Sequence, residues 1–190
     1  MKLLKIILII IVALIILLTI VYAYYGGFKK LIFRIVRQGG EFIVFEEVTG
    51  DYSESEKVIR KICQQLINDE EIRITKKIGI YFDDSKKKGE NMYAEVGCII
   101  ENINNDKQEE LKQKYKIKVL PETDYIITEF PYYNNSSVMI GIMKIYPAFE
   151  KYMIMNGYNK NEEKVTTEIY DMLNKKIIYR KAVPVNNQNN

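Results

Sequence analysis

Apolar and polar positions in the second half of the chain follow two periods, which predict a strand, a helix and two more strands. Residues 125–132 mix β-branched and aromatic side chains and predict a strand, and Pro131 marks its end or a sheet edge. A helix over about 137–156 follows, because apolar residues recur there every three or four positions. These residues are Ile142, Ile145, Tyr146, Phe149 and Met153. Asn134 to Ser137 offer side-chain oxygens that can cap its start. Strands over 166–173 and 177–183 complete the unit.

The first half of the chain repeats this order. The pattern predicts a strand over 41–48, a helix over 53–68 and strands over 78–82 and 93–101, and a polar connector over 102–116 has room for a short helix. Two β-α-β-β repeats of similar length predict an α+β domain. We expect one antiparallel sheet with both helices on one face, preceded by one transmembrane helix.

The apolar run at the N-terminus predicts that transmembrane helix. Ile6 to Tyr25 are twenty residues without a charge, enough to cross the roughly 30 Å hydrocarbon core of a bilayer. A cleaved signal peptide is the alternative, with a cleavage site at Val21-Tyr22-Ala23, but its apolar region usually has only about 7–15 residues. We therefore expect a retained anchor. The predicted segments are an anchor over 1–27, a juxtamembrane connector over 28–40, a domain over 41–184 and a disordered tail over 185–190.

Basic residues around the anchor predict its orientation. They are the terminal amine, Lys2 and Lys5 before the apolar run and Lys29, Lys30, Arg34 and Arg37 after it. The small excess after the run predicts a domain on the cytoplasmic side. Cys63 and Cys98 both fall in apolar-periodic segments, so we expect buried free thiols, in agreement with a reducing compartment.

Composition removes several classes of function. The net charge of +3 is small and dispersed, so we expect no nucleic-acid partner. The chain has no histidine, which excludes histidine-based acid–base catalysis and histidine-ligated metals. No phosphate-binding glycine loop or CxxC pair is present, and we expect no cofactor and no metal. The adjacent Asp83 and Asp84 are typical of a turn rather than of a metal site.

Carboxylates and the fifteen tyrosines remain as candidate chemistry. Glu168 and Tyr170 flank Ile169 in a predicted strand and therefore share one face, and Glu95 lies in the middle of another strand. A carboxylate in an aromatic-lined concavity can bind a cationic ligand or act as a general acid or base. The alternative is a solvated Glu168 beside Lys164 or Lys176, which strand spacing alone favours. Tyrosines 132, 133, 146 and 152 either line a pocket or pack in the core.

Several short motifs, taken in order, resemble one family. They are Tyr81-Phe-Asp-Asp84, Thr128-Glu-Phe-Pro-Tyr132, Tyr146-Pro-Ala-Phe149 with Tyr152, and Glu168-Ile-Tyr170. Together with the two repeats they resemble the GyrI-like small-molecule-binding domain over about residues 28–184, although Ser85 follows Asp84 where many such domains have proline. Related domains are effector-binding modules of transcription regulators. The resemblance implies that Glu168 is the pocket carboxylate and Tyr170 its neighbour.

The outline of anchor plus domain is most similar to the membrane-anchored, testis-expressed members of this family that act in autophagy of the endoplasmic reticulum. Those members carry an acidic tail with an aromatic-x-x-aliphatic peptide, whereas this chain ends six residues after Pro184. Residues 170–173 match the peptide but fall in a predicted strand. We therefore do not carry the autophagy role over. No helix-turn-helix segment precedes the domain, so we do not expect a transcription regulator either.

These observations predict a single-pass membrane-anchored binding or adaptor protein. Its partners would be the membrane and a small amphipathic or cationic ligand, or a partner peptide. The expected ligand-binding residues are Glu168, Tyr170, Glu95, Tyr132 and Tyr146. A GyrI-like hydrolase that uses Glu168 and Tyr170 is the alternative, and a structural anchor with a closed groove is a third hypothesis.

Overall fold

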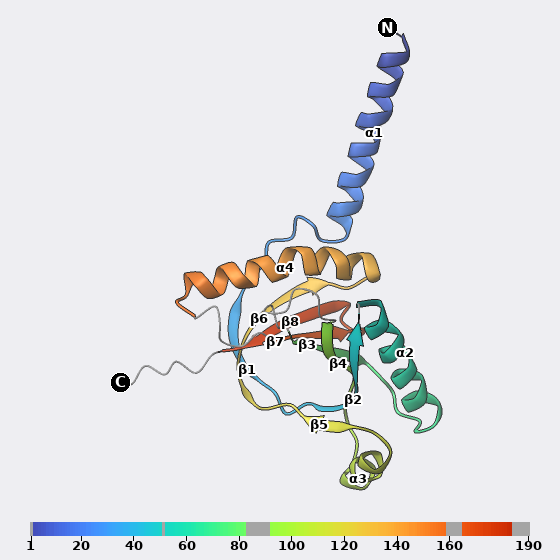
Figure 1. Cartoon of the computed structure of the whole chain (residues 1–190), viewed down its shortest axis with the longest axis vertical. Helices are drawn as coiled ribbons and strands as arrows, with labels where there is room; N and C mark the ends of the chain where they lie inside the picture. Colours follow the sequence, from blue (N-terminus) through green and yellow to red (C-terminus); the bar gives the residue numbers. More distant parts are fainter. Residues whose placement is uncertain (1, 51, 83–91, 159–164, 184–190) are drawn as a thin grey trace.

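Two similar units form one curved antiparallel sheet in the computed structural model (Figure 1). The structure describes residues 2–50, 52–82, 92–158 and 165–183. The helices are α1 (Lys2–Tyr24), α2 (Tyr52–Asn68), α3 (Asn105–Lys114) and α4 (Asn135–Met155). The strands are β1 (Arg34–Gln38), β2 (Phe42–Gly50), β3 (Lys76–Phe82), β4 (Met92–Ile100), β5 (Ile117–Val119), β6 (Thr123–Pro131), β7 (Val165–Asp171) and β8 (Lys176–Ala182).

The strand order confirms the predicted repeat. The sheet runs β1-β6-β8-β7-β3-β4-β2-β5, so β2-α2-β3-β4 and β6-α4-β7-β8 have mirrored strand orders. Their third elements, β3 and β7, pair antiparallel at the centre, where Gly79 lies opposite Glu168 and Ile78 opposite Ile169. The join between the units therefore places the middle of β7 next to the middle of β3.

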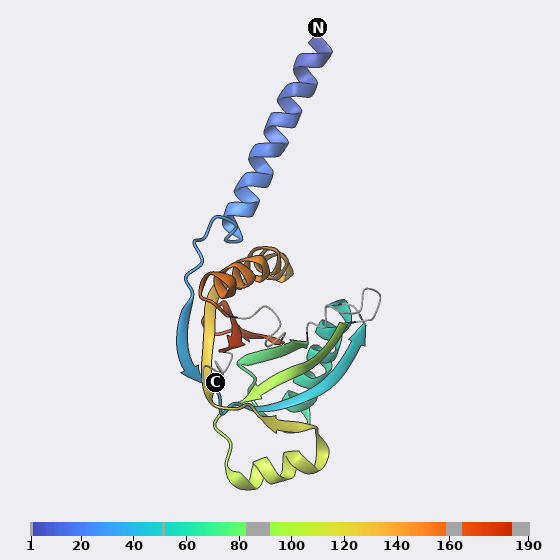
Figure 2. The same ribbon diagram turned by 60° about the vertical axis from the view of Figure 1, so that its left-hand side comes forward.

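Each helix packs on its own half of the sheet, and both lie on the same face. Ile62 and Leu66 of α2 share a core with Val96 and Cys98 of β4. Ile145 and Phe149 of α4 share a second core with strands of the other unit. A third core, which includes Ile43, Ile78, Ile99 and Ile169, covers the opposite face of the sheet, whose curvature is visible in Figure 2. Both faces of the central strands are thus buried.

Two strands were not predicted. β1 lies within the stretch expected to be a connector and pairs with β6, and β5 pairs with the outer edge of β2. Both are short edge strands. The polar connector contains α3, where Asn104 caps the helix by accepting from the Lys107 amide at 2.9 Å.

The N-terminal helix extends away from the domain (Figure 1). Among the described residues, α1 is the one helix that is long and apolar enough to cross a membrane. None of its residues is buried in the domain. A signal sequence near an N-terminus meets the same criteria of length and composition, so the helix alone does not separate the two hypotheses.

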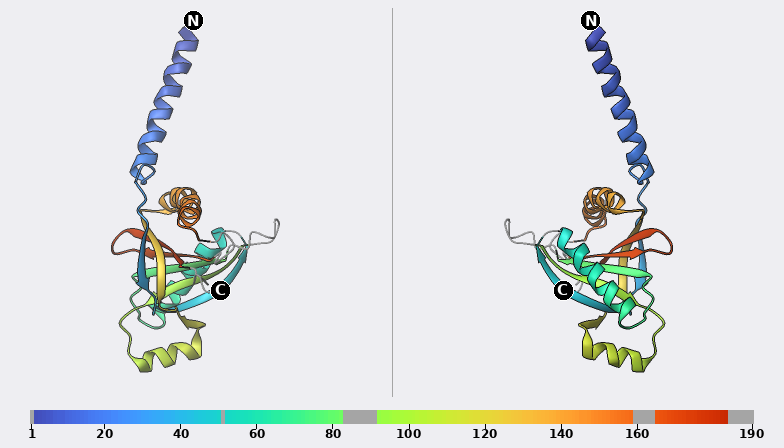
Figure 3. Two further views of the ribbon diagram at one scale, coloured as in Figure 1. Left: turned by 90° about the vertical axis from the view of Figure 1, so that its left-hand side faces the viewer. Right: turned by 90° about the vertical axis from the view of Figure 1, so that its right-hand side faces the viewer.

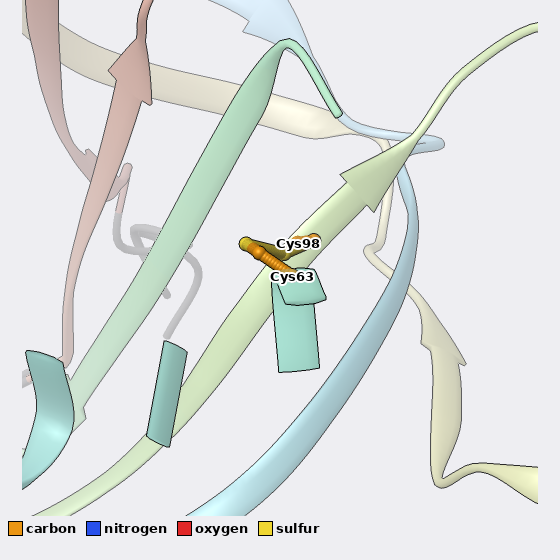
Figure 4. Close-up of a disulfide and its surroundings, with 2 residues drawn as sticks. All are labelled: Cys63 and Cys98. Atoms are coloured by element: carbon orange, nitrogen blue, oxygen red, sulfur yellow. A yellow bond between two sulfur atoms is a disulfide. The ribbon is translucent and has the colours of Figure 1, made fainter. Parts of the chain in front are cut away.

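The prediction of free thiols was wrong. Cys63 of α2 and Cys98 of β4 form a disulfide with a Cα–Cα distance of 6.5 Å (Figure 4). Both residues are buried, as expected, but the packing of α2 on β4 brings their side chains together. The argument for a reducing compartment therefore loses its basis.

Candidate ligand-binding site

A buried carboxylate lies at the centre of the sheet beneath the helices. Glu168 is 0% exposed, and each of its oxygens accepts a hydrogen bond from a phenol. Tyr170 donates to Oε2 at 2.5 Å, and Tyr146 of α4 donates to Oε1 at 2.8 Å. The interpretation of Glu168 as a solvated strand residue was wrong. Lys176 instead pairs with Glu129 at 3.1 Å, and Lys164 lies outside the described residues.

The strand register gives Glu168 its surroundings. On the sheet it lies between Gly79 of β3 and Tyr179 of β8. Gly79 leaves room beside the carboxylate, and the Tyr81 side chain fills that room. A Cβ at position 79 would come within 2.6 Å of the Tyr81 hydroxyl. Tyrosines from three strands and one helix therefore gather around one carboxylate.

The protonation of these phenols follows from burial and from the carboxylate. Burial raises the pKa of Tyr146 well above its usual value, and the charge of Glu168 raises it further. The same two causes raise the pKa of Tyr179, with Tyr81 contributing less. Both phenols therefore remain protonated at neutral pH, and Tyr146 acts as a hydrogen-bond donor to Glu168.

Several buried hydroxyl groups near this centre lack a partner. Among the described residues, the side-chain oxygens of Tyr179, Thr128, Thr166 and Ser55 are buried without a hydrogen bond. Thr128 lies opposite Tyr179 on the sheet, so these two groups are neighbours. Buried polar groups are usually satisfied by protein, water or a ligand, so these oxygens leave hydrogen-bonding capacity beneath the helices.

A cleft of about 490 Å³ opens above this floor. Its lining residues come from α2, β3, the end of β6, α4 and β7: Ser55, Glu56, Ile59, Lys77, Tyr81, Tyr132, Asn135, Val138, Met139 and Tyr170. Tyr132 packs edge-on against Tyr170 with ring centroids 5.5 Å apart. Glu168 lies beneath this lining, behind Tyr170. The cleft has the size of a small-molecule site, in contrast to the closed groove of the third hypothesis.

The start of α4 forms one rim of the cleft. Asn134 caps the helix by accepting from the Ser136 amide at 2.9 Å, and the Ser137 hydroxyl accepts from the Asn134 amide at 3.0 Å. This capping box confirms the predicted helix start. The next residue, Asn135, donates to Glu56 of α2 at 2.9 Å and so bridges the two helices across the rim.

The rim carries charges of both signs. Burial lowers the pKa of Lys77, while the charge of Glu56 opposes that shift. Glu56 also accepts from Arg60 at 3.0 Å. The exposed rim is therefore a mixed-charge surface, whereas the buried floor contains a carboxylate.

Four of the five expected ligand-binding residues lie together. Tyr132 and Tyr170 line the cleft, and Glu168 and Tyr146 form the bonded pair beneath it. Glu95 is elsewhere, which corrects its assignment. It alternates along β4 with Ala94 and Val96 of the helix-side core, so it points to the opposite face of the sheet. There it pairs with Lys118 and has a side chain that is 14% exposed.

Other contributors were not predicted from the sequence. Tyr81, Tyr179, Ser55, Lys77 and Asn135 belong to the cleft or its floor. The nearest signal was the motif Tyr81-Phe-Asp-Asp84, which carried the family resemblance but was not assigned to the site. Asp83 and Asp84 themselves lie outside the described residues. Within the described part of the chain, no group of three or more metal-ligating side chains is close enough to hold a metal ion.

Comparisons with known proteins show the fold of the chain. No family model and no curated protein sequence matches it. The EcmrR chain of an EcmrR–DNA complex matches with a TM-score of 0.58 at 13% identity over 86% of this chain and 62% of that one. The isolated EcmrR C-terminal domain gives a TM-score of 0.55 at 13% identity, covering 82% of this chain and 98% of that chain. An integron cassette protein from the mobile metagenome of Vibrio cholerae gives a TM-score of 0.52 at 10% identity, covering 82% of this chain and 99% of that chain.

These matches show a shared α+β fold. The chain spans less than two thirds of the length of the full EcmrR chain. The DNA in that structure is bound by EcmrR. The fold is consistent with the predicted resemblance to GyrI-like domains. None of the comparisons supports the closer resemblance to the autophagy receptors of the endoplasmic reticulum.

Proposed function

We propose that this domain binds a small lipophilic cation in the cleft between α2 and α4. The observation that carries the proposal is the buried Glu168 carboxylate, which lies under an aromatic floor and accepts hydrogen bonds from two tyrosines. Aromatic faces and a carboxylate in a medium of low dielectric both attract an organic cation. The cleft volume of about 490 Å³ suits a molecule of that class.

The carboxylate in the floor supports a cation rather than an anion. The rim itself holds charges of both signs, because Glu56 pairs with Arg60 at 3.0 Å and Lys77 lies nearby. Tyr146 and Tyr170 each donate to one oxygen of Glu168, and hydrogen bonds donated to a carboxylate favour its charged form. Burial then strengthens its field within the cleft.

Binding explains the geometry better than hydrolysis does. A general base must reach the proton it removes, within about 3 Å or through one water. Glu168 lies beneath the cleft lining and is 0% exposed, and both of its oxygens are already occupied by phenols. The hydrolase hypothesis would need Tyr170 and Glu168 to separate first. A partner peptide is the second candidate ligand for the same cleft.

We further propose that α1 holds the domain on a membrane as a single-pass anchor. Its length and apolar composition support this role. The charge excess that predicted the cytoplasmic side amounts to one group. The Cys63–Cys98 disulfide favours the opposite side, because disulfides persist in oxidising compartments. Alkylation of the membrane-bound chain before and after reduction tests on which side of the membrane the domain lies. Thiols that react without a reductant would favour the cytoplasmic side.

A matched pair of ions tests the binding proposal. Tetraphenylphosphonium and tetraphenylborate have nearly the same shape and opposite charge. We expect the full chain in a non-ionic detergent to bind the phosphonium at least about tenfold more tightly, a difference of about 1.4 kcal/mol. Equal affinity for both ions, or tighter binding of the borate, would overturn the proposal.

A further inference from the structure

Helix α4 exposes several apolar side chains in addition to the buried stripe that packs against the sheet. Its buried stripe of Ile145, Phe149 and Met153 covers the second core. Four other apolar side chains of the helix are exposed: Met139 (55%), Met143 (74%), Ile154 (54%) and Met155 (74%). Glu150 and Lys151 of the same helix are exposed too, so this outer stripe is an apolar surface interrupted by charge, which is the composition that suits a lipid–water interface.

Direct contacts hold α4 at the end of α1. Lys144 donates to the Gly27 carbonyl at 2.7 Å and also to the Lys29 carbonyl. Asn134 donates to the Tyr25 hydroxyl at 2.9 Å. The ring of Tyr24 stacks on Tyr133 with centroids 5.3 Å apart. As a result, α4 crosses the domain directly beneath α1, on the side of the domain from which α1 leaves (Figure 3).

The segments beside α4 have the composition of a membrane interface. Phe28 is 68% exposed and Ile32 70% exposed in the connector. Lys29 and Lys30 lie between them and are exposed as well. Tyr133, next to the start of α4, is 51% exposed. Exposed aromatic, aliphatic and basic side chains together are typical of surfaces that lie among lipid headgroups, where basic residues interact with anionic lipids.

From these contacts we infer that the outer stripe of α4 lies on the surface of the bilayer that α1 enters. The inference rests on the membrane anchor of the proposed function and extends it to the route of the ligand. Asn135, Val138 and Met139 of the same helix line the cleft. The cleft therefore opens beside the headgroup region, and an amphipathic cation concentrated there enters sideways from the lipid rather than from bulk water.

Site-specific labels test this placement in the full chain. We would attach an environment-sensitive fluorophore at Met143→Cys or Met155→Cys and, as the control, at Val119→Cys on β5. Val119 is apolar and 59% exposed but belongs to an edge strand remote from α4 in the sheet. The variants are reconstituted in vesicles of phosphatidylcholine and phosphatidylserine, with or without brominated acyl chains, which quench fluorophores that touch lipid.

We expect loss of emission from both α4 labels and unchanged emission from the Val119→Cys label. Unquenched α4 labels would overturn the inference, as would equal quenching at all three positions. Binding of tetraphenylphosphonium in detergent is measured on the same variants. Cation binding without quenching would refute only the membrane contact, and quenching without cation binding would refute only the proposed ligand.

Discussion

Tyr146 of α4 donates a hydrogen bond of 2.8 Å to Glu168 of β7 and so ties the second helix to the sheet through a buried carboxylate. The first helix is tied to its half of the sheet differently, by the disulfide between Cys63 and Cys98. The two helices meet at the rim through Asn135 and Glu56. The cleft is therefore bounded by two helices, of which α4 is linked to β7 by a hydrogen bond and α2 to β4 by a disulfide.

Removal of the Tyr146 hydroxyl should destabilise the domain. Tyr146→Phe leaves one oxygen of a buried carboxylate without its donor, which costs about 1–3 kcal/mol of unfolding free energy. Chemical denaturation of the full chain in detergent measures this loss. Tyr152→Phe on the same helix is the matched control, because the Tyr152 hydroxyl makes no hydrogen bond among the described residues and its ring stacks on Phe33. Equal effects of the two changes would contradict the importance of the Tyr146 link.

Reduction of the disulfide should lower the stability of the α2 half. Cys63 and Cys98 are 35 residues apart, and closing a loop of that length stabilises a fold by about 3–4 kcal/mol in the chain-entropy description. Melting temperatures with and without a strong reductant measure the difference. The double variant Cys63→Ala, Cys98→Ala should show no response to the reductant. A wild-type chain that melts identically in both conditions would argue against a disulfide in solution.

A methyl group at position 79 should alter the floor of the cleft. In Gly79→Ala the new Cβ would lie 2.6 Å from the Tyr81 hydroxyl, so the ring must move. We expect weaker binding of tetraphenylphosphonium and a loss of about 1–3 kcal/mol of stability from overpacking. Adding Tyr81→Leu removes the ring and should recover much of the stability. If the second change gives no recovery, Tyr81 is not the group that the methyl displaces.

Acid should weaken the contact of α3 with the rest of the domain. Glu70 has a side chain that is 3% exposed, and it binds Lys107 at 2.9 Å and Lys114 at 3.1 Å. The bond to Lys107 is the main reason that its pKa lies below the usual 4.5, although burial opposes the shift. A lowered folded-state pKa gives stability that is present above pH 4.5 and is lost as the pH falls below it.

The comparison of two variants isolates this effect. Between pH 7 and pH 3, the melting temperature of Glu70→Gln should fall less than that of the wild type. Glu109→Gln is the control, because among the residues that the structure describes Glu109 pairs only with Lys112, at 2.7 Å and exposed to solvent. The account of Glu70 fails if the melting temperatures of all three proteins fall by the same amount between pH 7 and pH 3.

The repeat and its sheet were predictable because both units carry clear helical and strand periods. The short edge strand β1 was not, since Arg34 and Arg37 bracket only two apolar residues in its sequence. The disulfide was missed because Cys63 and Cys98 meet only through the packing of α2 on β4. Local patterns contain no information about such contacts.

The site was only partly predictable for a similar reason. Alternation correctly places Glu168 and Tyr170 on one face, but it does not say which face the helices cover. Both faces of this sheet are buried, so the apolar pattern around Glu95 looks much like that around Glu168. Tyr81 joins the site through the pairing of β3 with the distant β7, which the sequence does not reveal, and Tyr179 joins it through the exact register of the β7–β8 hairpin.

The most direct measurement of the central claim compares two strand glutamates. Affinity for tetraphenylphosphonium is measured for the full chain in detergent, for Glu168→Gln and for Glu95→Gln, with urea denaturation as a check that each variant is folded. Glu168 lies under the cleft, whereas Glu95 pairs with Lys118 on the other face. We predict that Glu168→Gln lowers affinity at least about tenfold, or about 1.4 kcal/mol, and that Glu95→Gln leaves it unchanged. A folded Glu168→Gln variant that binds the cation as tightly as the wild type would contradict a carboxylate-centred site.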